Sequence, residues 1–221
     1  MFRNYFKTAI RNLLRYKGFA IINISSLTIG MIGCLVIGLF VWDDRQYDKS
    51  IPGNENIFRI YEERNDNGNI THAAISPPAF ATYLKNTYPE VDLTLRILMS
   101  DDKFLMEKDE QRNYEDKGWF VESSFFNMFS LKFKSGDPGT ALTAPNTIVL
   151  TEDLAKRYFN NEDPLNKIII IDKDSFAVKG VLAKIPAHFH LDFNYLMSLP
   201  SARIPKERME KWTWHQFYTY V

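Results

Sequence analysis

AIINISSLTIGMIGCLVIGLFVW, residues Ala20 to Trp42, is a run of 23 residues without a charged side chain. As an α-helix it spans about 34 Å, which exceeds the ~30 Å hydrocarbon core of a bilayer. A helix in the core of a soluble protein is rarely uncharged over this length. A cleavable signal peptide would have a shorter apolar run and a small-residue cleavage site, and no such site follows Trp42. The run therefore predicts an uncleaved transmembrane helix over residues 20–42.

The charges on either side of this helix predict its direction. Residues 1–19 contain five basic residues and no acidic one, whereas Asp43, Asp44, Arg45 and Asp48 follow the helix. Because basic flanks stay in the cytoplasm, we expect the N-terminus inside and residues 43–221 outside. Four of the basic residues, Arg3, Lys7, Arg11 and Arg15, recur every four positions between apolar ones, which predicts a basic amphipathic helix over residues 1–19 at the cytoplasmic interface.

One face of the predicted membrane helix is made of small residues. Ser26, Gly30, Cys34 and Gly38 recur every four positions. Such faces let a second helix approach closely, although glycine is common in membrane helices in general. We expect this helix to pack against others.

We expect residues 43–221 to form a single domain. No repeat or Pro/Gly-rich linker divides them, and their 22 basic residues stand against all 27 acidic ones, a net charge of −5. This charge offers no attraction to nucleic acid or to an anionic lipid surface. The lone cysteine, Cys34, excludes an intrachain disulfide and leaves the redox compartment open.

Helix and strand signals alternate along this domain, which indicates an α+β fold. We expect strands at 57–61, 94–99, 103–108, 147–150, 167–171 and 176–182, and helices at about 77–88, 122–129 and 152–159. Ser76 is the expected N-cap of the first helix and Thr151 that of the third. Turns are expected at Asp101-Asp102, between the second and third strands, and at 136–139 and 172–175, while Asn160-Asn161 end the third helix.

Catalytic motifs are absent from the sequence. There is no G-x-x-x-x-G-K-[ST] loop, which excludes a Walker-type ATPase, and no G-x-S-x-G, H-E-x-x-H or C-x-x-C. We expect no catalytic or cofactor-binding residues. Seven aromatic residues near Trp119 and the C-terminus are consistent with a ligand groove, but core positions are the commoner outcome and the one we expect: Trp119, Phe120, Trp212, Trp214, Phe217, Tyr218 and Tyr220.

One short segment has the residue types of a metal site. His188, His190 and Asp192 alternate, so on a strand their side chains would share one face. Two histidines and an acid within five residues also occur often by chance, and a polar strand edge after Pro186 is the simpler interpretation. We therefore expect no metal site.

Several motifs in order along the chain together resemble one family. The opening FKTAIRNLLRYKGFAIINISSLTIGM is similar to that family's basic helix running into its first membrane helix. The further matching segments are Tyr88-Pro89-Glu90-Val91 with Arg96, Ser124–Phe129, Ser135–Pro138, Asn146–Phe159, Glu162–Lys167, Phe176–Val181 and Pro186–Phe193, with His190 at the family's histidine and Asn166 where a glycine is usual. Together they resemble the N-terminal part of MacB/FtsX-type ABC transporter permeases, which carry a MacB-like periplasmic core domain.

This resemblance implies a role in transport. It implies a permease subunit, or its N-terminal portion, in the bacterial inner membrane, with a periplasmic domain that receives ATP-driven motion during export of lipoproteins, peptides or drugs. The implied partners are a separate ABC-type ATPase subunit and further permease membrane helices or a second permease copy, and a periplasmic adaptor is left open. It also implies that the core domain continues beyond Val221.

Two other functions fit the same sequence features. A membrane-anchored periplasmic binding or sensor module would have the same topology and a similar mixed domain. A membrane-tethered metalloenzyme would require His188 and His190 to bind a metal ion.

Overall fold

The computed structural model describes residues 2–100, 102–160 and 162–221. The chain divides into two units, one ending at Tyr47 and the other running from Asp48 to Val221. Parts of two predictions, the turn at Asp101-Asp102 and the helix end at Asn160-Asn161, fall on Asp101 and Asn161, outside the described residues.

The first unit consists of two helices. Helix α1 (Phe2–Arg15) and helix α2 (Lys17–Asp44) are joined by Tyr16, whose φ of −111° and ψ of 57° depart from helical values. With 28 residues, α2 is about 42 Å long. It contains the whole apolar run, and among the described residues it is the helix that is long and apolar enough to cross a membrane.

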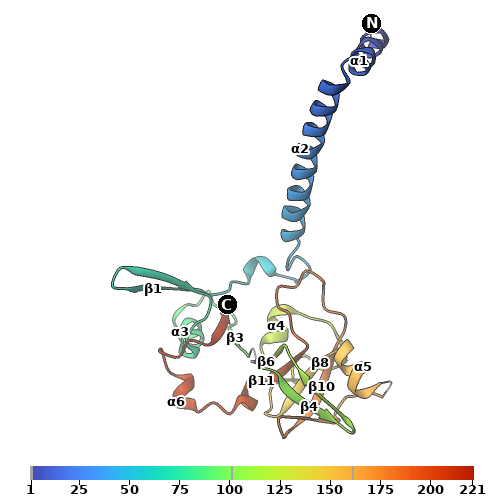
Figure 1. Ribbon diagram of the computed structural model, residues 1–221. Coiled ribbons are helices and arrows are strands. Elements are labelled where there is room, and N and C mark those ends of the chain that lie inside the picture. Colours follow the sequence, from blue (N-terminus) through green and yellow to red (C-terminus); the bar gives the residue numbers. More distant parts are fainter. Residues whose placement is uncertain (1, 101, 161) are drawn as a thin grey trace. The chain divides into compact units, whose positions relative to one another are not determined.

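A ten-stranded sheet forms the centre of the second unit (Figure 1). Nine strands follow the order β12-β3-β6-β11-β8-β10-β9-β4-β5, and β7 pairs with β10. Their bounds are β3 (Leu95–Met99), β4 (Phe104–Lys108), β5 (Gln111–Glu115), β6 (Gly118–Val121), β7 (Phe133–Gly136), β8 (Thr147–Thr151), β9 (Ile168–Ile171), β10 (Asp174–Leu182), β11 (Tyr195–Ser198) and β12 (Phe217–Tyr220).

The central strands of this sheet are buried on both faces. In β8, Val149 packs in one hydrophobic cluster, while Ile148 and Leu150 pack in a second. Because successive side chains of a strand point to opposite faces, the continuous apolar run of β8 requires a cover on each side. Helix α4 (Phe125–Phe129) contributes to the first cluster and helix α5 (Glu152–Phe159) to the second.

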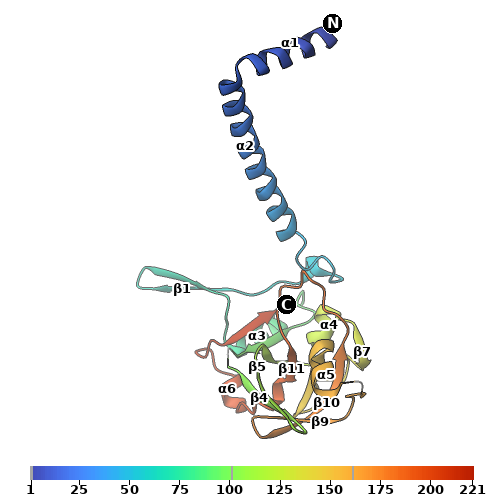
Figure 2. The same ribbon diagram turned by 45° about the vertical axis from the view of Figure 1, so that its right-hand side comes forward.

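The remaining elements lie at the margins of the unit. They are η1 (Asn54–Asn56), α3 (Pro78–Thr87), η2 (Leu199–Ala202), α6 (Lys206–Met209) and the hairpin of β1 (Glu62–Asp66) and β2 (Asn69–Ala73). This hairpin projects away from the sheet, as Figures 1 and 2 both show. Its turn is Asn67-Gly68, with φ of 52° and 90°, the two positive values that favour Asn-Gly in a tight hairpin. The hairpin was not predicted, although Asn-Gly is a hairpin signal.

The α+β prediction is confirmed, with one apolar N-terminal helix before a mixed domain. The hairpin of β9 and β10 was also predicted, and its turn residues Asp172 and Lys173 both have positive φ. Thr151 caps α5 as expected, because its side chain accepts a hydrogen bond from Leu154 N. Asn166 has a φ of +62°, the left-handed conformation that Asn tolerates in place of glycine.

Other local predictions were wrong for identifiable reasons. Ser76 is not the N-cap of α3: it is buried, its backbone pairs with Phe217, and its hydroxyl lies 2.7 Å from that of Thr219, so the helix begins one residue later than expected. The strands predicted at 94–99 and 103–108 are present as β3 and β4, but they are not neighbours in the sheet: β3 pairs with β12 and β6, while β4 pairs with β5 and β9.

Two further expectations held only in part. The segment 57–61 is extended and hydrogen-bonded beside β12 but forms only an isolated bridge there, between Arg59 and Tyr220. Of the seven aromatic residues expected in the core, Trp119, Phe217 and Tyr220 are buried, whereas Trp212 is exposed against α3.

Candidate functional site

Three segments far apart in the sequence meet at the side chains of Asp48, His190 and Tyr220, which we call the junction. Asp48 Oδ1 accepts a hydrogen bond from the backbone N–H of His190 at 3.1 Å. Asp48 Oδ2 lies 2.8 Å from His190 Nδ1, and His190 Nε2 lies 2.8 Å from the hydroxyl of Tyr220. One imidazole ring therefore links the start of the second unit to strand β12.

The backbone reinforces these contacts. The N–H of Asp48 donates to the carbonyl of His188 at 2.7 Å. Asp48 has a φ of 58°, a left-handed conformation that Asp adopts more readily than most residues, and this turns the chain towards the loop of residues 183–194, between β10 and β11. The first residue of the second unit is thus fixed by its backbone as well as by its side chain.

The loop holds His190 in place through apolar neighbours. Phe189, Leu191 and Phe193 are buried in the first hydrophobic cluster, which fixes the chain on both sides of His190. The ring of His190 also packs edge-to-face against Phe129, with 5.7 Å between the ring centres. His190 is therefore positioned by the core rather than by solvent-exposed contacts.

The contact between His190 and Asp48 is electrostatic in character. Although Nδ1 lies 2.8 Å from a carboxylate oxygen, it has no partner at hydrogen-bond angles. Both side chains are partly buried, at 27% and 30% exposed, which reduces screening by water. The pair attracts most strongly when the imidazole is protonated.

Tyr220 is the most buried member of the junction, at 2% exposed. Burial raises the pKa of its hydroxyl well above the ordinary value, so the group is neutral when it meets His190. A neighbouring strand-like segment holds β12 as well, since Phe58 and Val221 exchange backbone hydrogen bonds. Beside this pair, the guanidinium of Arg59 lies 3.6 Å from the centre of the Tyr218 ring.

A cavity of ≈ 330 Å³ opens beside the junction. Asp48, His190, Tyr220, Phe129 and Arg59 contribute to its wall. Its wall combines one acid, two basic groups and aromatic surface, and the acid is already engaged by His190.

The side chains of His188, His190 and Asp192, the segment with the residue types of a metal site, do not converge. Asp192 is 76% exposed and pairs with Lys117 at 2.6 Å, while His190 faces Asp48 and Tyr220. His188 takes part through its backbone carbonyl. Across residues 2–100, 102–160 and 162–221 no group of three or more potential ligands is placed to hold a metal ion. The metal interpretation gains no support from this geometry.

Two other ion pairs lock the sheet and were also missed from the sequence. Arg96 on β3 donates to Glu122 and to the carbonyl of Pro78. Glu115, a buried acid at 4% exposed, accepts two hydrogen bonds of 2.8 Å from Arg157 and one of 2.9 Å from Tyr158. No local pattern marks these pairs, because the partners lie 26 to 43 residues apart.

The comparison with protein families identifies the chain. A family model described as the MacB-like periplasmic core domain matches residues 20–221. The chain belongs to this family. Membership makes the second unit a MacB-like periplasmic domain of the ABC transporter permease family and implies an ABC transporter with an ATPase partner. Together with the apolar helix, it indicates a membrane-anchored periplasmic domain.

One solved structure shares the fold of this MacB-like domain, and two others match it with lower TM-scores. A domain of a predicted permease protein from Porphyromonas gingivalis matches with a TM-score of 0.66 and 20% identity, covering 77% of this chain and 74% of that one. The periplasmic region of MacB from Actinobacillus actinomycetemcomitans has a TM-score of 0.47 and 19% identity, with coverages of 65% and 62%. The extracellular domain of the ABC-type transporter YknZ from Gram-positive bacteria has a TM-score of 0.48 and 14% identity, covering 75% of this chain and 81% of that one. A search of curated proteins gave no match.

Proposed function

We propose that this chain acts as a permease subunit that carries ATP-driven motion from a partner ATPase to its periplasmic domain. The observation behind this proposal is the junction. Asp48 follows the last residue of α2 by only four residues, a reach of at most about 14 Å. A linker this short, fixed at its far end by backbone and side-chain contacts, passes displacement on instead of absorbing it.

The path through the junction also reaches the end of the sheet. From Asp48 the contacts run through His190 to Tyr220, and strand β12 pairs with β3. A displacement of Asp48 would therefore reach the edge of the central sheet through these side chains. The proposed cargo class is a lipoprotein, peptide or drug exported across the bacterial inner membrane.

The proposed orientation places α1 in the cytoplasm and the MacB-like domain in the periplasm. The five basic residues before the apolar run and the three acidic residues that follow it support this direction. The ATPase belongs on a separate subunit, since the sequence carries no phosphate-binding loop of the Walker type.

Copurification tests the proposal. The full gene product is expressed together with ABC-type ATPases of the same organism and purified in mild detergent through a tag on the permease. We expect one ATPase to copurify in stoichiometric amount and to hydrolyse ATP in the complex. If the ATPases remain folded in the same detergent but none is recovered with the permease, the proposal is contradicted and the binding or sensor module is favoured.

A matched pair of variants tests the role of the junction. In the same complex, Asp48→Asn removes the charge that faces His190, whereas Asp192→Asn removes an exposed charge on the same loop region. We expect reduced ATP hydrolysis only in the first variant, because transport and hydrolysis are coupled through the domain. Equal activity in both variants would remove the junction from the path.

A further inference from the structure

Helix α1 carries two distinct sides, and the described residues of the first unit, 2–47, bury neither of them. Four basic residues recur every four positions, Arg3, Lys7, Arg11 and Arg15, and lie along one side. The opposite side holds Phe2, Phe6, Ala9 and Leu13, while Ile10 borders the basic side and Leu14 lies within it. No residue of the helix is buried, and Phe2 is 94% exposed.

This helix needs an external counter-charge. Residues 1–42 contain no acidic side chain, so the three successive pairs of basic residues repel one another. Like charges four residues apart weaken an isolated helix, and a helix of 14 residues is marginal in water even with favourable pairs. An array of anions along the basic face removes the repulsion.

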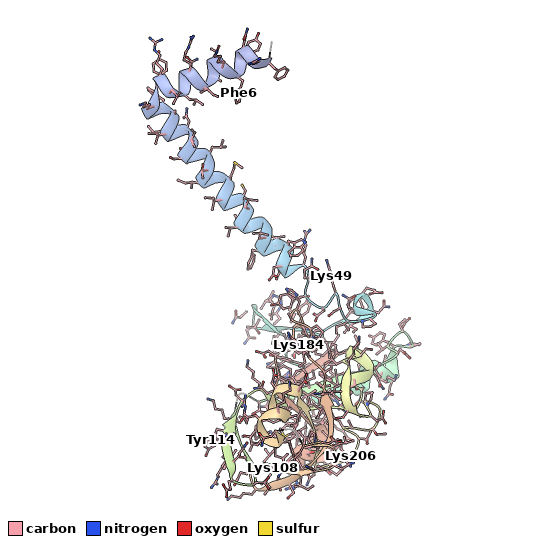
Figure 3. The ribbon with its side chains drawn as sticks, turned by 90° about the vertical axis from the view of Figure 1, so that its right-hand side faces the viewer. Phe6, Lys49, Lys108, Tyr114, Lys184 and Lys206 are labelled. Carbon is pink, nitrogen blue, oxygen red and sulfur yellow. The ribbon has the colours of Figure 1, made fainter. Side chains whose placement is uncertain are left out.

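The position of α1 selects the kind of anion. Only Tyr16 separates the end of α1 from the start of α2, so in a membrane the end of α1 lies where α2 leaves the hydrocarbon core. Figures 2 and 3 show α1 turning sharply away from the axis of α2, and Figure 3 labels Phe6 on α1. A helix so placed lies along the bilayer surface, where acyl chains cover the apolar face and headgroups meet the basic face.

We propose that α1 binds the phosphates of anionic phospholipids and that the anionic lipid content of the membrane determines whether α1 lies on the bilayer surface. The proposal rests on α2 spanning the bilayer, and not on the ATPase partner. Electrostatic attraction to such a surface increases the binding constant of α1 for the membrane by about fivefold for each basic side chain. Aromatic Tyr5 and Tyr16 fit the headgroup level, where tyrosine is enriched.

The test uses the full chain in lipid nanodiscs without ATP. In a Cys34→Ser background, Leu13→Cys carries a spin label on the apolar face, and its depth is read from its relative accessibility to oxygen and to a water-soluble nickel chelate. We expect the label to be buried in equal mixtures of phosphatidylcholine and phosphatidylglycerol, and to become water-accessible in phosphatidylcholine alone or at high salt.

Two charge variants separate the outcomes. The variant R3Q/K7Q/R11Q/R15Q should lose the difference between the two lipid compositions, whereas R3K/R11K/R15K, which keeps every charge, should retain it. Glutamine is a good helix former, so loss of helicity does not explain such a result. Burial of the wild-type label in phosphatidylcholine alone would overturn the proposal. So would a label that becomes immobilised only when the copurifying ATPase is added, which would assign the face to a protein partner.

Discussion

Replacing Asp48 with asparagine tests whether the junction is a structural link. Asparagine tolerates the left-handed φ of 58° at this position, so the substitution changes the charge with little backbone strain. The amide oxygen can still accept the N–H of His190, but charge-assisted hydrogen bonds are about twice as strong as neutral ones. The lost part of that bond and of the attraction to Nδ1 together amount to about 1 kcal/mol for these partly buried groups.

This loss predicts a modest fall in thermal stability. For a unit of this size, 1 kcal/mol corresponds to a fall in Tm of about 2–4 °C. Near-ultraviolet circular dichroism of the full chain in detergent follows the unit through buried aromatic residues such as Trp119. Asp192→Asn is the control, since its exposed pair with Lys117 should leave Tm unchanged. Equal Tm values for the two variants would refute the view that Asp48 secures the domain.

Three further predictions concern other parts of the domain. Gly118→Ala would place a Cβ 2.2 Å from the ring of Tyr195, and this overpacking should lower the free energy of unfolding by about 1–3 kcal/mol, as measured with denaturant. Gly139→Ala is the control and should be neutral, because its Cβ would stay 3.6 Å from Asp137. Similar losses in both variants would contradict the packing described. The hydrogen bond from Arg64 holds the pKa of Glu62 below its usual range, so Glu62 contributes stability above about pH 4.3 that is lost as the pH falls through the lowered pKa. Nuclear magnetic resonance titration should show that Arg64→Gln raises the pKa of Glu62. An unchanged pKa in this variant would count against the contact. Burial, and then the bond to Glu115, raises the pKa of Tyr158 to about 12, so its contribution to stability is full below about pH 10 and is lost as the pH rises through about 12. Tyrosinate absorbance of Tyr158→Phe should lack one component that titrates near pH 12 in the wild type, while the later components of the more deeply buried Tyr195 and Tyr220 remain. An unchanged titration curve near pH 12 would contradict this assignment.

Local signals in the sequence predicted the local structure well. The apolar run of residues 20–42 lies within α2, and the cap at Thr151 opens α5. The hairpin of β9 and β10 was predicted because its apolar strands and polar turn are adjacent in the sequence. In each of these cases the information lies within about 15 residues.

Long-range pairing was not predictable in the same way. Ser76 resembled a helix cap, yet pairing with Phe217, which lies 141 residues away in the sequence, determined its conformation. The junction joins three segments through a histidine that the sequence marked only by its family resemblance and as a possible but unexpected metal ligand, while Asp48 and Tyr220 carried no motif that linked them to it. Single-sequence patterns do not report which strands become neighbours, and that order places these side chains together.

The most direct test of the transport proposal is an ATP-dependent distance across the chain. Spin labels at Ile22→Cys in α2 and at Lys184→Cys in the periplasmic domain, in a Cys34→Ser background, are measured by pulsed electron spin resonance in the complex with its ATPase. We predict that the distance distribution changes between the nucleotide-free and ATP-bound complexes, and that Asp48→Asn broadens or abolishes this change. An identical distribution in both nucleotide states of the wild-type complex would contradict the proposal that the chain transmits motion.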